Sequence, residues 1–266
     1  MAQMLIVDNH PVMRQYLGEL LAKEGHEVHA AEDGLAALDS LRTLRPQVIF
    51  VDLIMPNIDG LALCRILRRL PEHAQAYVVI LSAVAVEAPE LVELSGANAA
   101  LPKGPFKTLG PAVLKLLREA QRQGFQGFQS GVRAVEDTSA REITRELVMQ
   151  KRHYELVLES LGEGLLELTG DARVVYANRC ALEILELPEE KILGCPLQEL
   201  FPEADLLGAA AGAGTELHRD GKQIDVRAYP SREPGGRTIV LLTDVTERRR
   251  MEEHLRQAQR LESVGT

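Results

Sequence analysis

Residues 1–123 alternate between short apolar runs and longer stretches in which the apolar positions have helical spacing. Five runs of strand-forming residues occur, at 4–7, 27–31, 47–51, 77–81 and 98–101. The stretches between them, such as VMRQYLGELLAKEG and GLALCRILRRL, are typical of amphipathic helices. Short continuous apolar strands separated by helices predict a parallel sheet with both faces covered. The fold class predicted here is therefore α/β, a doubly wound five-stranded parallel sheet.

Beyond residue 123 the pattern changes to one long helix. The glycine-rich GFQGFQSG indicates a linker or hinge before it. A seven-residue repeat then runs in two stripes: Ala140, Leu147, Tyr154 and Leu161, and, offset by three, Ile143, Gln150 and Val157, in which Gln150 is a polar layer. This heptad pattern over 135–162 predicts a two-stranded coiled coil, and hence a homodimer. The alternative is a surface helix that docks on its own chain.

From residue 163 the chain reads as strands around a helical middle. GLLELTGDARVVYAN predicts a hairpin that turns at TGD, and TELHR, QIDVRAYPSR and RTIVLLTDV predict three further strands. An α+β domain with an antiparallel sheet is therefore expected. The predicted division of the chain is 1–123 for the first domain, 124–162 for the linker and long helix, 163–246 for the second domain, and 247–266 for the start of a charged C-terminal helix.

Composition narrows the possible functions. The chain has 266 residues, 45% hydrophobic and 26% charged, as expected for a soluble protein of about two domains. A net charge of −9 argues against a nucleic-acid surface. No apolar run approaches the ~20 residues that cross a bilayer, and MAQMLIVDNH lacks the features of a secretion signal. Three scattered cysteines fit a reducing compartment. We expect a cytoplasmic protein with no nucleic-acid or membrane partner.

Polar residues stand at the ends of the predicted parallel strands. Asp8 and Asn9 end the first strand, Asp52 ends the third, Ser82 ends the fourth, and Lys103 follows the fifth. Because ligands of doubly wound sheets bind outside the carboxyl ends of the strands, these side chains are expected to meet in one pocket. Two close carboxylates favour a divalent cation, and oxygen ligands suit Mg²⁺.

The same groups suit phosphoryl transfer. A magnesium ion, a lysine ammonium and a serine hydroxyl together can neutralise the three equatorial oxygens of a phosphoryl group. A carboxylate beside them can act as the nucleophile that accepts this group. The pocket therefore predicts a phosphoacceptor carboxylate.

Four segments carry a family resemblance. LIVDNHPVMR, VIFVDLIMPNIDG, VILSA and LPKGPF resemble, in order, the four signatures of response-regulator receiver domains, which have a flavodoxin-like fold. The resemblance implies that Asp52 is the phosphoacceptor and that Ser82 and Lys103 sense the phosphate. The magnesium ligands that it implies are Asp8, Asn9, Asp52 and the backbone carbonyl of Ile54.

The sequence departs from this family at three places. Asn9 stands where the family usually has a second acid, which should weaken metal binding. Gly104 is inserted between Lys103 and Pro105, where the family usually reads Lys-Pro. Ala100 replaces the usual aromatic residue of the fifth strand, so switching by an aromatic rotamer is not expected. A pseudo-receiver that is never phosphorylated and only docks partners therefore stays open as an alternative.

The second domain resembles a PAS domain. The segment GLLELTGDARVVYANRCALEILELPEEKILGCPLQELFP resembles its first half, and LLTDVTERRR resembles the Asp-x-Thr motif that closes PAS sheets. The resemblance marks Asn178, as a local helix cap, and Gly194 as fold residues. It also implies a signalling joint in which Asp244 and Thr246 cap the following helix and Asp244 pairs with Arg248.

The resemblance does not identify a PAS ligand. A photoreceptor Asn-Cys-Arg motif is missing from the central helices, and His218 reads as a solvent-facing strand residue rather than a haem ligand. Neither flavin nor haem is expected, and the PAS ligand stays unknown.

The C-terminal segment resembles the start of the dimerisation helix in PAS-linked sensor histidine kinases. The chain ends at LESVGT, before a phosphorylatable histidine, and contains no glycine-rich ATP lid. We therefore expect the N-terminal part of a hybrid histidine kinase whose catalytic domain is absent from this chain. A cognate histidine kinase or phosphotransfer protein would phosphorylate the receiver, and the helix 135–162 would pass the signal to a PAS homodimer. The alternative is a ligand-binding interaction module without phosphorylation.

Overall fold

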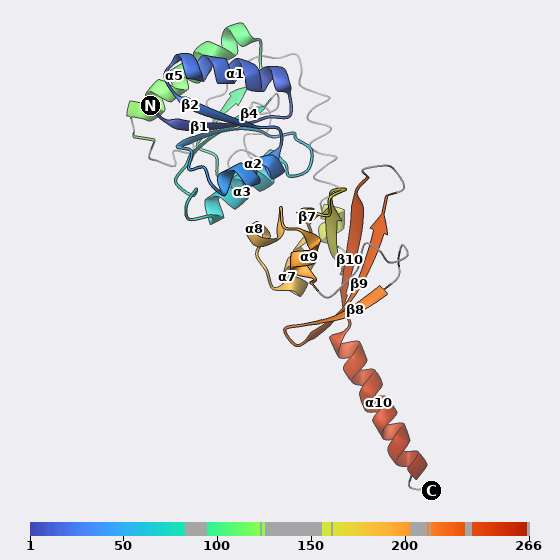
Figure 1. The fold of residues 1–266 in the computed structure, drawn as a ribbon. Coiled ribbons are helices and arrows are strands. Elements are labelled where there is room, and N and C mark those ends of the chain that lie inside the picture. The colour runs from blue at the N-terminus through green and yellow to red at the C-terminus, as the bar shows by residue number, and fades with distance from the viewer. Residues whose placement is uncertain are drawn as a thin grey trace. The chain divides into compact units, whose positions relative to one another are not determined.

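The computed structural model describes residues 1–82, 95–122, 124–125, 156–160, 162–202, 212, 214–231 and 236–264. The chain divides into two compact units, Met1–His153 and Tyr154–Thr266, and each is described by itself (Figure 1). Most of the coiled coil predicted over 135–162 lies outside the described residues, although residues 156–159 are helical. The predicted domain boundaries and the dimer stay predictions. Among the described residues, no helix is both long and apolar enough to cross a membrane.

The first unit contains a five-stranded parallel sheet with the strand order β2-β1-β3-β4-β5. Its strands are β1 (Gln3–Val7), β2 (Glu27–Ala31), β3 (Val48–Asp52), β4 (Tyr77–Ser82) and β5 (Ala99–Pro102). Every residue of β3 and β4 is buried, which explains why these strands are continuous apolar runs in the sequence. The predicted doubly wound α/β fold is confirmed.

Helices cover both faces of this sheet. They are α1 (Pro11–Lys23), α2 (Gly34–Leu41), α3 (Gly60–Arg69) and α5 (Phe106–Arg122). Figure 1 shows α1 and α5 on one face and α2 and α3 on the other. Leu17 and Leu21 of α1 and Val113 of α5 are fully buried against Ile6 and Phe50 of the central strands. This core fixes the strand ends, and therefore the residues that follow them.

Local sequence signals set the beginnings of α2 and α3. The side chains of Asp33 and Asp59 accept hydrogen bonds from the third residue of each helix, Ala36 N (2.8 Å) and Ala62 N (2.8 Å). Gly60 lies directly beneath the end of β3: a Cβ atom there would be 2.1 Å from the carbonyl oxygen of Asp52. Only glycine lets α3 start this close to the strand.

The second unit contains an antiparallel sheet with the strand order β7-β6-β10-β9-β8. Its strands are β6 (Gly164–Leu168), β7 (Val174–Ala177), β8 (Gly214–Arg219), β9 (Lys222–Pro230) and β10 (Thr238–Asp244). Its helices are α7 (Arg179–Leu185), α8 (Glu189–Ile192), α9 (Leu197–Leu200) and α10 (Thr246–Val264). The inner face of the sheet is apolar and buried, with Leu166, Val226 and Val240 on adjacent strands. The predicted α+β domain with an antiparallel sheet is confirmed.

Asn178 holds together the beginning of this unit. Its side chain is fully buried. Its Oδ1 accepts hydrogen bonds from Leu165 N (2.8 Å) and Ala181 N (2.9 Å), and its Nδ2 donates to Leu158 O (3.0 Å) and Glu163 O (2.9 Å). Asn178 is thus the N-cap of α7, as the sequence indicated. It also joins the helical turn at 156–159 to β6.

Gly194 has a structural reason for being glycine. Its φ is +80°, a left-handed conformation that other residues rarely adopt. Its N–H donates to Val174 O (2.7 Å), and its carbonyl accepts from Nε (3.0 Å) and Nη2 (2.9 Å) of Arg173. These bonds hold the segment between α8 and α9 against β7.

Candidate functional site

The polar strand-end residues of the first unit meet at one edge of the parallel sheet. Asp52 and Ser82 are the last residues of β3 and β4, while Asp8 and Lys103 directly follow β1 and β5. The register pairs Asp52 with Leu81 and Ser82 with Pro102, so neighbouring strands end at nearly the same level. Parallel pairing alone therefore brings together residues that are far apart in the sequence.

Lys103 lies between the two carboxylates. Its Nζ is 2.7 Å from Oδ2 of Asp8 and 2.7 Å from Oδ2 of Asp52. Asp8, Asp52 and Ser82 are buried, and the Lys103 side chain is 18% exposed. The backbone N–H of Lys103 donates to the carbonyl of Ser82 (3.0 Å), which ties the end of β4 to the lysine. The structure thus brings together Asp8, Asp52, Ser82 and Lys103.

The pocket is negatively charged although it contains a lysine. Two carboxylates face one ammonium, which leaves one negative charge uncompensated. Burial raises the pKa of Asp52 above its ordinary value. The Lys103 ammonium lowers this pKa, the Asp8 carboxylate raises it, and the Ile54 N–H, 3.4 Å from Asp52 Oδ1, lowers it. Burial outweighs the lysine, so the ionised site gains from additional positive charge.

Asp8 is held by its surroundings but retains acceptor capacity. Its Oδ1 accepts a hydrogen bond from His10 N (2.9 Å). Its Oδ2 is buried, and the Lys103 ammonium lies 2.7 Å from it. A carboxylate oxygen can accept more than one contact, so Oδ2 could also be a ligand of a metal ion.

Arg14 is a residue of this site that the sequence analysis missed. Its Nη1 donates to the backbone carbonyl of Asp8 (2.6 Å), and the Asp8 N–H donates to Ala31 O (3.1 Å). Both bonds fix the backbone that carries the Asp8 carboxylate. The hydrophobic periodicity gives no signal for Arg14, because its partner is a backbone carbonyl six residues earlier.

The donors fit a hard cation better than a zinc-like one. In the part of the chain that the structure describes, no group of three or more His, Cys, Asp or Glu side chains is arranged to hold a metal. The pocket instead offers two carboxylates. Asn9, which is exposed, directly follows Asp8 in the chain, and the Ile54 N–H lies 3.4 Å from Asp52 Oδ1. Oxygen donors with room for retained water are the ligands that Mg²⁺ prefers. The residues present therefore fit this ion.

The joint between β10 and α10 contains Asp244 and Thr246. Asp244 Oδ1 accepts from Thr246 N (2.9 Å) and Thr246 Oγ1 (2.5 Å), and Thr246 Oγ1 accepts from Gln223 N (2.8 Å) on β9. Burial acts to raise the pKa of Asp244, but the hydrogen bonds from Thr246 together with the positive charges of Lys222 and Arg250 outweigh it, and the pKa lies below its ordinary value. The expected pair of Asp244 with Arg248 is not formed. Arg248 Nε instead lies 3.4 Å from Oε1 of Glu252, one turn further along α10.

A second contact joins α10 to the sheet. Arg249, the residue after Arg248, forms an ion pair with Glu216 of β8 and contacts Glu252 through Nη1 (3.1 Å). His218, which the sequence placed on a strand facing solvent, is on β8 and exposed.

Comparison with known proteins identifies both units. Residues 4–107 match the response regulator receiver domain, and residues 158–250 match the PAS fold. Response regulator MprA of Mycobacterium ulcerans (strain Agy99) is 28% identical over 185 residues, which is 68% of this chain and 78% of MprA. The chain is therefore similar, in its two matched parts, to proteins of two-component signal transduction. It consists of a response regulator receiver domain followed by a PAS domain.

Similar solved structures cover less than half of this chain. The chemotaxis protein CheY4 of Vibrio cholerae is 29% identical and covers 45% of this chain and 98% of its own, with a TM-score of 0.42. The receiver domain of sensor histidine kinase PA1611 from Pseudomonas aeruginosa PAO1, whose structure has a magnesium ion in the active-site cleft, is 26% identical. It covers 44% of this chain and 95% of its own, with a TM-score of 0.41.

Proposed function

We propose that Asp52 accepts a phosphoryl group from a cognate histidine kinase or phosphotransfer protein. The observation that carries this proposal is the position of Lys103, whose ammonium is 2.7 Å from both Asp8 and Asp52 in a buried pocket at the strand ends. A structural ion pair needs one acid and one base. A second buried acid beside them suits a site that binds a cation and a phosphoryl group.

The reaction is a displacement at phosphorus. A carboxylate oxygen of Asp52 attacks the phosphorus, a P–O bond to Asp52 forms, and the bond from phosphorus to the donor breaks with its electrons leaving on the donor. The Lys103 ammonium and the Ser82 hydroxyl bind equatorial oxygens of the transferred group. Asp8, Asp52, Asn9 and the carbonyl of Ile54 would hold Mg²⁺, which when bound supplies the remaining positive charge.

The output would pass to the PAS domain. We propose that phosphorylation changes the receiver face near Ser82, that the helix 135–162 transmits the change to a PAS dimer, and that α10 leads to a histidine kinase absent from this chain. The heptads of 135–162 support the dimer. The hydrogen bonds of Thr246 to Asp244 and to Gln223 support a joint between the PAS sheet and α10. Cys64, Cys180 and Cys195 form no disulfide, which suits a cytoplasmic location.

Phosphorylation is tested with acetyl phosphate and Mg²⁺, followed by electrophoresis on a phosphate-binding gel. The wild-type chain should show a slower band, and Asp52→Asn should not. Asp39→Asn is the matched control, because Asp39 is an exposed aspartate of the same domain, and it should behave as wild type. If the gel band of the wild-type chain is not slowed by acetyl phosphate or by a histidine kinase as donor, the proposal is refuted and a pseudo-receiver is favoured.

The coupling is tested separately by cross-linking. Leu147→Cys, in a chain without the three native cysteines, should form a disulfide between two copies. Its yield should change when beryllofluoride and Mg²⁺ occupy the receiver. An unchanged yield would refute coupling through the helix but would leave phosphorylation of Asp52 intact.

A further inference from the structure

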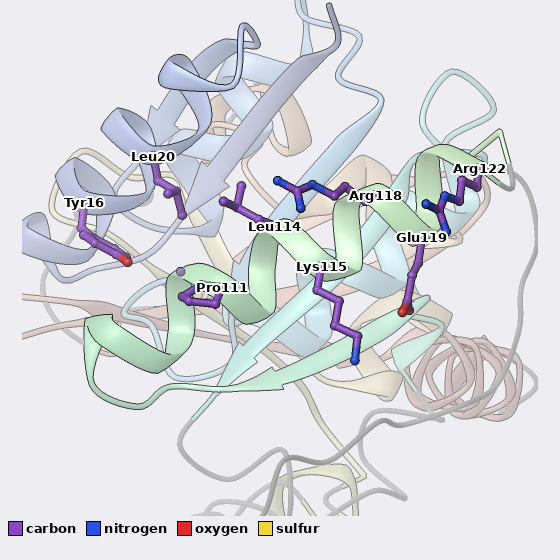
Figure 2. A pocket seen from close by; sticks show the side chains of 9 residues that line it. Tyr16, Leu20, Pro111, Leu114, Lys115, Arg118, Glu119 and Arg122 are labelled. Carbon is purple, nitrogen blue, oxygen red and sulfur yellow. The ribbon is translucent and has the colours of Figure 1, made fainter.

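A groove of about 600 Å³ runs between α1 and α5 of the receiver domain (Figure 2). The phosphoacceptor pocket contributes no residue to its lining. Its apolar floor includes Tyr16 and Leu20 of α1 and Leu114 of α5. Its outer wall contains the basic residues Lys115, Arg118 and Arg122 of α5.

The floor of the groove is held in place before anything binds. The ring of Tyr16 stacks on Phe106 with a centroid distance of 4.3 Å, and its hydroxyl donates to the carbonyl of Phe106 (2.7 Å). A Cβ atom on Gly110 would be 2.3 Å from this hydroxyl, so a glycine in α5 makes room for the tyrosine. Leu20 and Leu114 are only partly buried and leave apolar surface beside the ring. A groove that already has its shape lowers the cost of binding.

The wall carries a stripe of positive charge. Lys115, Arg118 and Arg122 are three and four residues apart and therefore lie on one face of α5. All three side chains are exposed. Within the described ranges none of these side chains has an ion pair or a hydrogen bond to another residue. Glu119 is the one acid among the lining residues, so the wall keeps an excess of positive charge on a chain whose net charge is −9.

The length of the groove indicates the shape of its occupant. The α5 residues along it run from Gly110 to Arg122, which at ~1.5 Å per residue is about 18 Å. This is about three turns of helix, longer than a compact small molecule needs. A second copy of the same face would bring basic stripe against basic stripe, since a two-fold interface pairs like patches. The charge therefore favours an acidic partner over self-association.

We propose that this groove binds an acidic amphipathic helix of a partner protein. The apolar face of that helix would lie on Tyr16, Leu20 and Leu114, and its carboxylates would face the basic stripe. This surface goes beyond the proposed phosphoryl transfer and does not depend on it.

The test uses the full chain and fluorescein-labelled peptides of about 18 residues, of which about 12 would span the groove at ~1.5 Å per residue. One peptide has leucines at helical spacing with glutamates between them, a second has the same composition in scrambled order, and a third has lysines in place of the glutamates. Fluorescence anisotropy should show roughly tenfold tighter binding of the first peptide than of either other. Arg118→Glu should weaken it by about tenfold, because repulsion replaces attraction. The control is Arg42→Glu, which reverses the charge of an exposed residue at the end of α2, on the opposite face of the sheet. This substitution should leave the affinity for the first peptide unchanged.

Three results would overturn the proposal. The first is equal affinity for the ordered and scrambled peptides. The second is an equal effect of the Arg118 and Arg42 substitutions. The third is another occupant: dimers in light scattering that Arg118→Glu dissolves, or vesicles with about 30% anionic lipid that bind the wild-type chain but not Arg118→Glu. Each variant is first checked for an unchanged melting temperature, which separates lost binding from lost folding.

Discussion

Replacing Lys103 by methionine should lower the stability of the receiver domain and strengthen its affinity for magnesium. Methionine keeps much of the length of the side chain but removes the ammonium that lies 2.7 Å from Asp8 and 2.7 Å from Asp52. At an effective dielectric constant near 20, each contact has a gross attraction of ~6 kcal/mol. Desolvation of the ammonium offsets much of this. Removing one partner of a buried ion pair typically costs about 3–5 kcal/mol.

For Lys103→Met we expect the free energy of unfolding to fall by about 3 kcal/mol, the lower end of this range. The reason is that the pKa of Asp52 would rise further, so that its protonation would relieve part of the repulsion between the two carboxylates. In EDTA this corresponds to a fall of about 10 °C in the melting temperature of the receiver transition. The two uncompensated carboxylates should then bind Mg²⁺ more tightly, so Mg²⁺ should restore more stability to the variant than to the wild type. Phosphorylation should nevertheless fall, because a positive contact to the phosphoryl group is lost.

Calorimetry of the full chain in EDTA and across a Mg²⁺ titration measures the melting temperature of the receiver transition and the stability gained from Mg²⁺. Lys23→Met, at the exposed end of α1, is the matched control and should change neither the melting temperature nor the gain from Mg²⁺. A Lys103→Met variant that melts at the wild-type temperature in EDTA and gains no extra stability from Mg²⁺ would show that the ammonium does not compensate the two acids. The charge argument for the pocket would then be wrong.

Three further predictions concern stability. Asn178→Ala should cost about 3 kcal/mol in urea unfolding of the PAS domain, because four hydrogen bonds are lost in a buried site; Gln198→Ala, at an exposed position of α9, is the control and should cost little. Burial lowers the pKa of His73 below 6.5, so the stability that the neutral imidazole contributes should be complete above pH 6.5 and fall as the pH drops below 6.5. His73→Gln should therefore reduce the dependence of the unfolding free energy on pH, measured in acid titrations followed by circular dichroism. Thr246→Val should cost about 1 kcal/mol and raise the pKa of Asp244 in NMR titration, since the hydroxyl bond is lost; a cost near zero would contradict the joint.

The strand-end site could be predicted because its geometry follows from the sheet. Each apolar run stops at a polar residue, and parallel pairing places those residues at one edge, so Asp8, Asp52, Ser82 and Lys103 needed no side-chain information. Arg14 could not be placed in this way, because its partner is a backbone carbonyl six residues earlier that the periodicity does not mark.

Interactions that depend on rotamers or on distant backbone were missed or wrong. Asn178 was identified as a cap, but its two bonds to Leu158 and Glu163 depend on where the preceding turn returns to the sheet. The pairing of Arg248 with Asp244 was wrong because Glu252, at the favourable i+4 position of the same helix, competes for the guanidinium. Nothing in the sequence pattern marks Arg68, at the end of α3, yet its guanidinium donates to the carbonyls of Ala74, Ala76 and Gly96.

The close approach of Gly60 to the carbonyl of Asp52 has a genetic consequence. Even alanine at position 60 would have to displace the backbone that carries Asp52, the proposed phosphoacceptor. Random mutagenesis screened for loss of signalling should therefore recover missense changes at codon 60 about as readily as at codon 52. Those alleles would look like failures of chemistry although the altered residue never touches the transferred group.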